Sequence, residues 1–247
     1  MSCSDLPQWY LRRRIPVVDL RSSTWTKARS EVLPPGYAPG QCMSRLVRAR
    51  RIRRVGRGVF IVVDPVRETP AIAIASALFA DLPHYVTTDA ALAFHGLIDQ
   101  PISRIAVVLS TRRRPIKIGS AVVRPVVQPP DRITAADAFD TMTDGFTVRL
   151  ATREQAVVDA LAEPAWMEHG DLLQEVLAAL TLDELDRTAA AAMARSTAAA
   201  QRLGYILEGA GQEAPAVLEQ LRPLRAVKLR PGQTTKGPYS TRWRVYG

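Results

Sequence analysis

Arginine side chains are concentrated between Arg45 and Arg57, in the run RLVRARRIRRVGR. A guanidinium group stays charged near neutral pH and presents a rigid fork of N–H donors, which matches phosphate oxygens and the edge of guanine. The chemistry available to this run is therefore the binding of a polyanion such as DNA. The alternative is a solvated helix face followed by an edge hairpin, where arginines only keep the surface charged.

Two elements must position these arginines. Apolar residues at helical spacing predict a helix over residues 39–50, and its first residue is a proline, which suits the first helical turn. The alternating residues 52–62 predict a β-hairpin, in which Gly56 and Gly58 supply the positive φ angles of a tight turn. This places Arg57 at the tip of the hairpin, within reach of a phosphate.

Two shorter helices precede this pair of elements. We expect them at residues 6–13 and 24–32, with a short extended piece at residues 15–18 between them. Helix, helix, helix and hairpin is the order of a winged helix-turn-helix, whose recognition helix enters the major groove. The side chains of the third helix that should face inward are Met43, Leu46 and Val47.

Most of the side chains that we expect to contact DNA lie in this module. They are Lys27, Gln41, Ser44, Arg45, Arg48, Arg53, Arg54 and Arg57. Gln41 and Arg45 lie toward the start of the third helix, where side chains reach base edges, whereas Arg57 suits the DNA backbone or the minor groove. A second cluster, Arg112, Arg113 and Arg114, is either a further phosphate contact or a solubilising loop.

Charge divides the chain into two parts. From Met1 to Arg67 the chain carries 14 Lys and Arg against 4 Asp and Glu, a net charge of +10, whereas the whole chain is +9. The basic excess therefore belongs to one end, as in a cationic module joined to a body of balanced charge. We predict an α+β protein, with a winged helix-turn-helix DNA-binding domain at residues 1–67 and a mixed α/β domain at residues 68–247.

The second domain is predicted to combine strands with helices. The strands are expected at residues 85–87, 105–109, 121–127 and 146–150. The helices are expected at residues 71–79, 88–95, 152–162, 171–180, 182–200, 200–208 and 214–221, before a basic strand-like end at 241–246.

Compartment and membrane association follow from simple features. Cys3 and Cys42 are too few for a disulfide framework and lack metal-ligand spacing, which fits a reducing cytoplasm. The sequence has no apolar core of signal-peptide length and no run of roughly 20 apolar residues. We therefore expect a cytoplasmic protein that does not associate with membranes.

Catalytic signatures are missing. Three histidines are few, and the patterns GxGxxG, GxSxG and HExxH, the P-loop and paired CxxC do not occur. Asp159 and Glu163 lie one helical turn apart, but Arg149 and Arg153 nearby favour surface salt bridges. We expect no enzymatic activity, no catalytic residue, no cofactor and no metal site.

Several segments, taken in order, resemble the AbiEi family of bacterial antitoxins. They are LVR at 46–48 with RVGRGVF at 54–60, TDAALAFHGL at 88–97, ATREQAVVD at 151–159, QRLGYILE at 201–208 and STRWRV at 240–245. Together they extend over most of the chain. The sequence departs from the family at Gln155, which stands where an Arg-Thr pair is usual.

The resemblance implies an antitoxin and autorepressor of a type IV toxin–antitoxin system. Its winged helix would bind repeats in its own promoter, and its C-terminal domain would neutralise a nucleotidyltransferase-like toxin without an obligatory stable complex. Two other functions stay open. A polar cavity in the C-terminal domain would favour a stand-alone regulator that responds to a ligand, and acidic residues converging on a metal would favour a nucleic-acid-processing enzyme.

Overall fold

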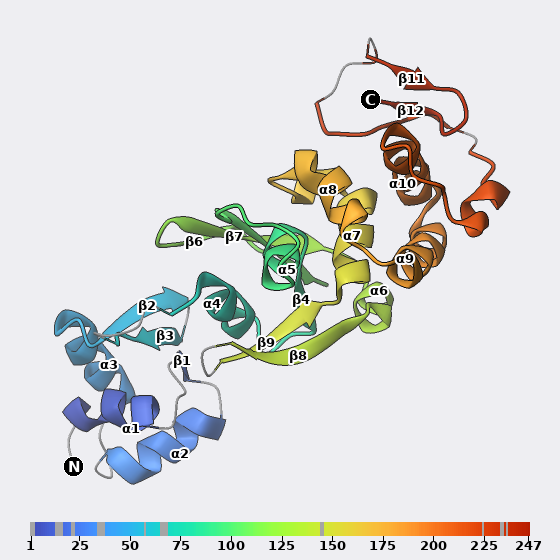
Figure 1. Ribbon diagram of the computed structural model, residues 1–247. Coiled ribbons are helices and arrows are strands. Elements are labelled where there is room, and N and C mark those ends of the chain that lie inside the picture. Colours follow the sequence, from blue (N-terminus) through green and yellow to red (C-terminus); the bar gives the residue numbers. More distant parts are fainter. Residues whose placement is uncertain are drawn as a thin grey trace. The chain divides into compact units, whose positions relative to one another are not determined.

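The computed structural model describes residues 3–12, 17–20, 23–33, 38–56, 58–64, 69–143, 146–223, 225–232, 235 and 237–247. The chain divides into two compact units, and each is described by itself (Figure 1). The N-terminal unit is Met1–Leu82 with Asp140–Arg149, and the C-terminal unit is Pro83–Phe139 with Leu150–Gly247. The first division therefore falls beyond residue 67, where we predicted the domain boundary.

The N-terminal unit contains helices and a small antiparallel sheet. A 3₁₀ turn η1 (Cys3–Asp5) precedes the helices, which are α1 (Leu6–Arg12), α2 (Ser23–Val32), α3 (Pro39–Arg48) and α4 (Ala71–Leu78). The strands are β1 (Val17–Asp19), β2 (Ile52–Gly56) and β3 (Val59–Val62), in the order β1-β3-β2. The helices and the hairpin predicted for this part of the chain are confirmed. Of the extended piece predicted at residues 15–18, residues 17 and 18 lie in β1, and residues 15 and 16 lie outside the described residues.

Aromatic and aliphatic side chains fill one core between these helices and the sheet. Tyr10 of α1 is fully buried, and Trp25 of α2 and Leu46 of α3 are buried beside Phe60 of β3. Interlocked side chains in a close-packed core resist sliding, so this packing sets the position of α3 on the sheet.

A disulfide joins Cys3 in η1 to Cys42 in α3, and their Cα atoms lie 5.7 Å apart. One disulfide is not a framework, so the expectation drawn from the number of cysteines stands, but it gave no indication of this bond. The number of cysteines in a sequence does not reveal whether two of them form a disulfide. The helical register turns Cys42 into the core, and the fold brings Cys3 beside it across 39 positions of sequence.

The turn of the hairpin was predicted correctly at one glycine and not at the other. Gly58 has a φ of +76°, as a tight turn requires. Gly56 instead ends β2 without a positive φ, and a Cβ atom there would lie 2.8 Å from Leu78 Cδ2 of α4. Gly56 thus provides space for α4 rather than a left-handed backbone. Arg57 lies outside the described residues.

A mixed six-stranded sheet has the order β6-β7-β5-β4-β9-β8. Its strands are β4 (His84–Thr87), β5 (Arg104–Leu109), β6 (Ile116–Ile118), β7 (Ala121–Val127), β8 (Ala138–Thr143) and β9 (Phe146–Ala151). Strand β5 runs parallel to β7 and antiparallel to β4, and its Val107, Val108 and Leu109 are fully buried. The predicted strands are confirmed, whereas β6 and β8 were missed because they are short or alternate weakly.

Helices of the C-terminal unit pack on the sheet and on one another. They are α5 (Asp89–Phe94), α6 (Pro130–Ala135), α7 (Arg153–Ala162), α8 (Leu173–Ala178), α9 (Leu182–Arg195) and α10 (Thr197–Gly209). Helices α5 and α7 contact β4, and α9 and α10 pack against α7 (Figure 1). The α+β class is confirmed. Within the described ranges, every helix is too short or too polar to cross a membrane.

Three boundaries near the C-terminus differ from the prediction. The helix expected at 182–200 ends before Ser196, whose extended backbone breaks it and whose Oγ caps α10 by accepting from Ala199 N–H at 3.1 Å. The helix expected at 214–221 is a 3₁₀ helix η4 (Ala216–Gln220). The basic end forms β11 (Tyr239–Ser240), a turn, and β12 (Val245–Tyr246), which pairs with β10 (Val227–Lys228).

Candidate nucleic-acid interface

Helix α3 presents a polar face opposite its buried stripe. Cys42, Met43 and Leu46 are buried, whereas the side chains that we predicted to point outward, Gln41, Ser44, Arg45 and Arg48, are exposed. The prediction for Val47 is wrong, since this side chain is 40% exposed. An inward stripe with Val47 and an inward stripe with Cys42 both fit helical spacing. Packing of α3 against η1 turns Cys42 inward and leaves Val47 exposed.

The end of α3 places an arginine in an unusual backbone conformation. Arg50 has a φ of 55°, and its N–H donates to Val47 O at 2.9 Å. Arg51 N–H donates to Leu46 O, also at 2.9 Å, so the helix closes with a Schellman motif. Glycine usually occupies the left-handed position, because a Cβ atom there costs about 1 kcal/mol.

Five exposed arginines follow one another from α3 into β2, and we call them the arginine segment. They are Arg48, Arg50, Arg51, Arg53 and Arg54. Arg53 and Arg54 lie on the edge strand of the sheet, and Arg54 Nε donates to Gly56 O at 3.2 Å. Sequence reasoning omitted Arg50 and Arg51, although they belong to the same basic run.

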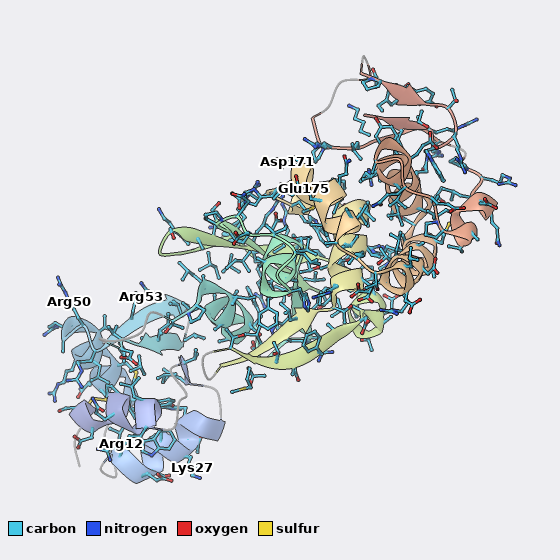
Figure 2. The ribbon with its side chains drawn as sticks, viewed as in Figure 1. Arg12, Lys27, Arg50, Arg53, Asp171 and Glu175 are labelled. Atoms are coloured by element: carbon cyan, nitrogen blue, oxygen red, sulfur yellow. A yellow bond between two sulfur atoms is a disulfide. The ribbon has the colours of Figure 1, made fainter. Side chains whose placement is uncertain are left out.

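The other residues predicted to contact DNA are Lys27 on α2, Ser44 on α3 and the triplet Arg112–Arg114. Figure 2 shows Arg50 and Arg53 near the junction of α3 and β2, well apart from Lys27 and Arg12 on α2 and α1. Ser44 is exposed, and its hydroxyl donates to Gly40 O within its own helix at 2.8 Å. The triplet Arg112, Arg113 and Arg114 is exposed in the C-terminal unit, in the connection between β5 and β6.

Asp159 connects α7 to the sheet. The side chain is 1% exposed, and its carboxylate accepts hydrogen bonds from Thr87 Oγ1 at 2.8 Å and Tyr85 Oη at 3.0 Å. Gln155 Nε2 donates to the same carboxylate at 3.0 Å. Burial raises the pKa of Asp159 to about 6, although these hydrogen bonds and the charge of Arg195 oppose the rise. Burial also raises the pKa of Tyr85.

The surface salt bridges predicted for Asp159 are wrong. Arg149 pairs with Asp140 at 3.4 Å, and Arg153 pairs with Glu184 at 3.2 Å. Helical spacing alone cannot tell which side of α7 faces the sheet when the residues between the charges are apolar. The fold directs Asp159 inward and leaves both arginines to other partners.

Two further acids hold a loop against the start of β5. Asp89 is 1% exposed and accepts the backbone N–H groups of Glu168 at 3.0 Å and His169 at 2.8 Å. Glu168 accepts the backbone N–H groups of Ser103 at 3.0 Å and Arg104 at 2.9 Å. Burial alone would raise the pKa of Glu168, but its hydrogen bonds with Ser103 and Arg104 lower it.

The segment QRLGYILE attaches the end of the chain to α10. Gln201 Nε2 donates to Trp243 O at 2.7 Å, and Trp243 Nε1 donates to Glu208 Oε2 at 2.7 Å. The Trp243 ring lies directly against Gly204, where a Cβ atom would come within 2.4 Å of the ring. The four residues Gln201, Gly204, Glu208 and Trp243 therefore form one packing unit.

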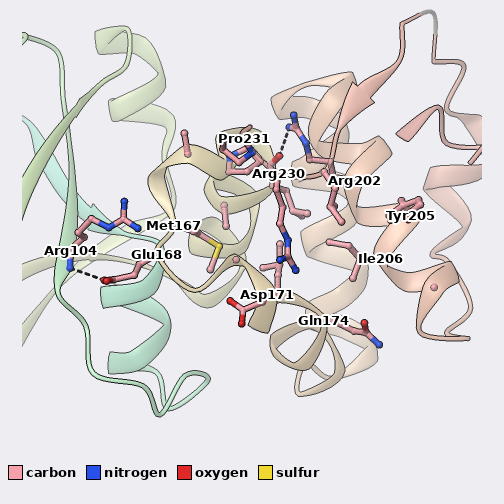
Figure 3. A pocket seen from close by; sticks show the side chains of 18 residues that line it. Arg104, Met167, Glu168, Asp171, Gln174, Arg202, Tyr205, Ile206, Arg230 and Pro231 are labelled. Atoms are coloured by element: carbon pink, nitrogen blue, oxygen red, sulfur yellow. Dashed lines mark hydrogen bonds between the residues drawn. The ribbon is translucent and has the colours of Figure 1, made fainter. Parts of the chain in front are cut away.

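A cavity of about 560 Å³ lies in the C-terminal unit, between the segment from Pro164 to Gln174, α10 and residues 229–231. Figure 3 shows Arg104 and Glu168 at one side, Arg202 and Ile206 at the other, and the Arg230 side chain between them. This volume lies within the range of small-molecule sites, roughly 300 to 1,000 Å³.

Arg202 has a structural role at the edge of this cavity. Its Nη1 donates to Leu161 O at 2.7 Å and to Ala162 O at 3.2 Å, and its Nε donates to Lys228 O at 2.8 Å. These carbonyls include the last two of α7, where the helix dipole favours a cation. Burial lowers the pKa of Arg202. The guanidinium thus caps α7 and holds β10 in place.

Among the residues described, no three His, Cys, Asp or Glu side chains gather where they could hold a metal ion. The crystal structure of the RV2827C protein from Mycobacterium tuberculosis shares the fold, with a TM-score of 0.66 and 16% sequence identity, over 98% of this chain and 90% of that chain. A search of curated proteins found no match.

The family described as the AbiEi antitoxin C-terminal domain matches residues 85–209. This range contains the three segments TDAALAFHGL, ATREQAVVD and QRLGYILE, whose buried polar groups tie helices to the sheet and to the chain end. The match covers half of the 247 residues. The chain therefore belongs to the AbiEi antitoxin family.

Proposed function

We propose that this protein is the antitoxin and autorepressor of a type IV toxin–antitoxin system. Membership of the AbiEi family supports the antitoxin role and implies that a toxin is the partner. The toxin is nucleotidyltransferase-like and is neutralised through the C-terminal unit, without need of a stable complex. The N-terminal unit acts as a winged helix that binds duplex DNA at promoter repeats in the cytoplasm. No catalytic step is assigned to the chain.

Support for DNA binding comes from the N-terminal unit. Its third helix exposes Gln41 and Arg45 on the face opposite the core, and the arginine segment continues this surface along an edge strand. Gln41 and Arg45 are suited to base edges, whereas the arginine segment is suited to phosphates. The triplet Arg112–Arg114 of the C-terminal unit is proposed as a second phosphate contact.

Affinity for duplex DNA should fall steeply with salt. If each arginine of the arginine segment neutralises one phosphate, the slope of log K against log salt concentration should be about −4.5. Fluorescence anisotropy of the full chain on a duplex from the region upstream of its own gene measures this slope. A slope near zero would contradict a DNA-binding function.

The substitution Arg50→Gly should raise the stability of the N-terminal unit and weaken its binding to DNA. Glycine adopts the φ of 55° without strain, so the N-terminal unit should gain about 1 kcal/mol in stability. Loss of one phosphate contact should make the salt slope shallower by about one unit. Arg12→Ala removes the same charge at a distance from Arg50 and serves as the matched control (Figure 2). Equal slopes for the two variants would show that Arg50 contacts no phosphate.

Toxin neutralisation should survive the loss of DNA binding. Co-expression of the toxin with a full-length variant carrying Arg48→Ala, Arg51→Ala and Arg53→Ala should still protect cells, because the family match lies in the other part of the chain. Immunoblotting must show a normal level of the variant. If this variant binds no DNA and also fails to protect at that level, the proposed division of labour between the two units is wrong.

The second candidate function is a stand-alone regulator that responds to a ligand. The cavity of about 560 Å³ favours it, since apolar side chains such as Met167 and Ile206 line it together with charged groups. The neighbouring genes separate the two functions. A toxin-like gene immediately downstream supports the antitoxin, whereas an isolated gene supports the ligand-responsive regulator.

A further inference from the structure

A smaller, polar cleft lies elsewhere in the C-terminal unit. Its volume is about 270 Å³, and it lies between β4, the end of β7, α6, α7 and α9. Six polar side chains line it: Tyr85, Gln128, Arg132, Gln155, Asp159 and Arg195. Convergent polar groups fix the orientation of a ligand in a binding site, and the proposed function uses none of the positive charge in this cleft.

The carboxylate in the cleft is already occupied. Asp159 accepts from Tyr85, Thr87 and Gln155 at 2.8 to 3.0 Å. Arg195 comes only as close as 4.0 Å, measured from its Nε to Asp159 Oδ1. This distance is too long for a hydrogen bond, so the carboxylate compensates the charge of Arg195 without satisfying its N–H groups.

Arg195 is left with an unsatisfied donor. Its side chain is 13% exposed, and its Nη2 atom is buried without a hydrogen-bond partner in the described part of the chain. A buried N–H group of a charged side chain is costly when no acceptor is present, and such groups in folded proteins are nearly always satisfied. The Arg195 guanidinium therefore keeps hydrogen-bonding capacity that the described residues do not use.

The opposite wall of the cleft supplies a second guanidinium. Arg132 on α6 is exposed, and the hydrogen bond that its guanidinium makes within the described residues is a long one, 3.4 Å from Nη1 to Gln128 Oε1. Two guanidinium groups face one carboxylate, which leaves the cleft with a surplus of one positive charge. Arginine forks bind carboxylate and phosphate oxygens in pairs, at higher strength than neutral acceptors.

We propose that this cleft binds a small oxyanion, a carboxylate or a phosphate, held between Arg195 of α9 and Arg132 of α6. The anion lies against the guanidinium groups of Arg195 and Arg132 where they line the cleft, and it neutralises the surplus charge. The volume of about 270 Å³ limits the ligand to a small molecule. This site goes beyond the proposed function, because neither DNA binding nor toxin neutralisation requires it.

The test uses the full chain and two probes, inorganic phosphate and acetate, with sodium chloride at equal ionic strength as the reference. A ligand that binds the folded state raises the Tm, so a titration followed by thermal unfolding yields an apparent Kd. We expect phosphate, acetate or both to raise the Tm above the chloride reference. Phosphate also stabilises folded proteins without binding a site, so only the part of the Tm rise that the Arg132→Gln variant loses is assigned to the cleft. A larger lost part with phosphate identifies a phosphate site, and a larger lost part with acetate identifies a carboxylate site.

Two variants and one control assign the effect to the cleft. Arg132→Gln should raise the apparent Kd at least tenfold and should fold normally, because Arg132 is exposed. Arg195→Lys keeps the charge but loses the fork, and it should weaken binding to a similar degree. Arg187→Gln is the matched control on the same helix, since Arg187 pairs with Glu154 outside the cleft.

Three results would overturn the proposal. The first is that neither probe raises the Tm above chloride. The second is that Arg132→Gln and Arg187→Gln bind the probe equally well. The third is that binding disappears in the Arg50→Gly variant and persists in Arg132→Gln, because the anion then occupies the DNA-binding surface instead of the cleft.

Discussion

Reduction of the Cys3–Cys42 disulfide is expected to lower the free energy of unfolding of the N-terminal unit by about 4 kcal/mol. The bond closes a loop across 39 positions of sequence, and this loop contains α1, β1 and α2. Without the bond, the unfolded chain regains the entropy of that loop. The folded state keeps its core, since Trp25, Leu46 and Phe60 need no disulfide to pack.

Hydrogen exchange resolves this effect unit by unit. Protection of amides in α1, α2 and α3 should fall by about three orders of magnitude when dithiothreitol is added, whereas protection in α10 should stay constant. In a Cys3→Ser variant, dithiothreitol should have no further effect. Unchanged protection of α3 on reduction would mean that the disulfide does not constrain this unit. The reduced state also matters for the proposed function, because the cytoplasm in which we propose that the protein acts would keep these thiols unpaired.

Substitution of Gly204 by alanine should destabilise the C-terminal unit by about 3 kcal/mol. The new Cβ atom would lie 2.4 to 2.5 Å from three atoms of the Trp243 ring. The ring is 2% exposed and cannot retreat easily, because Glu208 holds its Nε1 at 2.7 Å and Gln201 holds its carbonyl at 2.7 Å. The clash must therefore displace the chain end from α10.

Gly209→Ala is the matched control for this substitution. Gly209 lies in the same helix, and a Cβ atom added there would have no atom within 4 Å, so alanine should be neutral or gain up to about 1 kcal/mol from helix propensity. Thermal unfolding compares the two variants, and limited trypsin digestion at the exposed Arg242 and Arg244 reports release of the chain end. Equal stability of both variants would show that Trp243 does not pack on Gly204.

Much of the local structure follows from short-range patterns. The Pro39 start of α3, the turn at Gly58 and the strands at 105–109 and 121–127 all depend on interactions between near neighbours, and each was predicted. The exposed Arg48, Arg53 and Arg54 were predicted for the same reason, because a charged side chain on a helix or an edge strand stays in water whatever the rest of the chain does.

The groups that were missed owe their partners to distant parts of the chain. Asp159 and Arg195 were not recognised as neighbours, because α7 and α9 come together only in the tertiary structure. Cys42 was not recognised as half of a disulfide for the same reason. Spacing along the sequence describes which residues share a face of an element, but it does not say which element that face will meet.

By itself the sequence determined most of the secondary structure, the concentration of positive charge in the first 67 residues and the resemblance to a family of antitoxins. Each of these depends on residue type and spacing within a short window. Only the tertiary structure decided that Gly56 leaves room for α4, that Gly204 leaves room for the Trp243 ring and that a polar cleft forms around Arg195. The physical reason is that close packing and the burial of polar groups act between residues far apart in sequence, and these contacts exist only once the chain has folded.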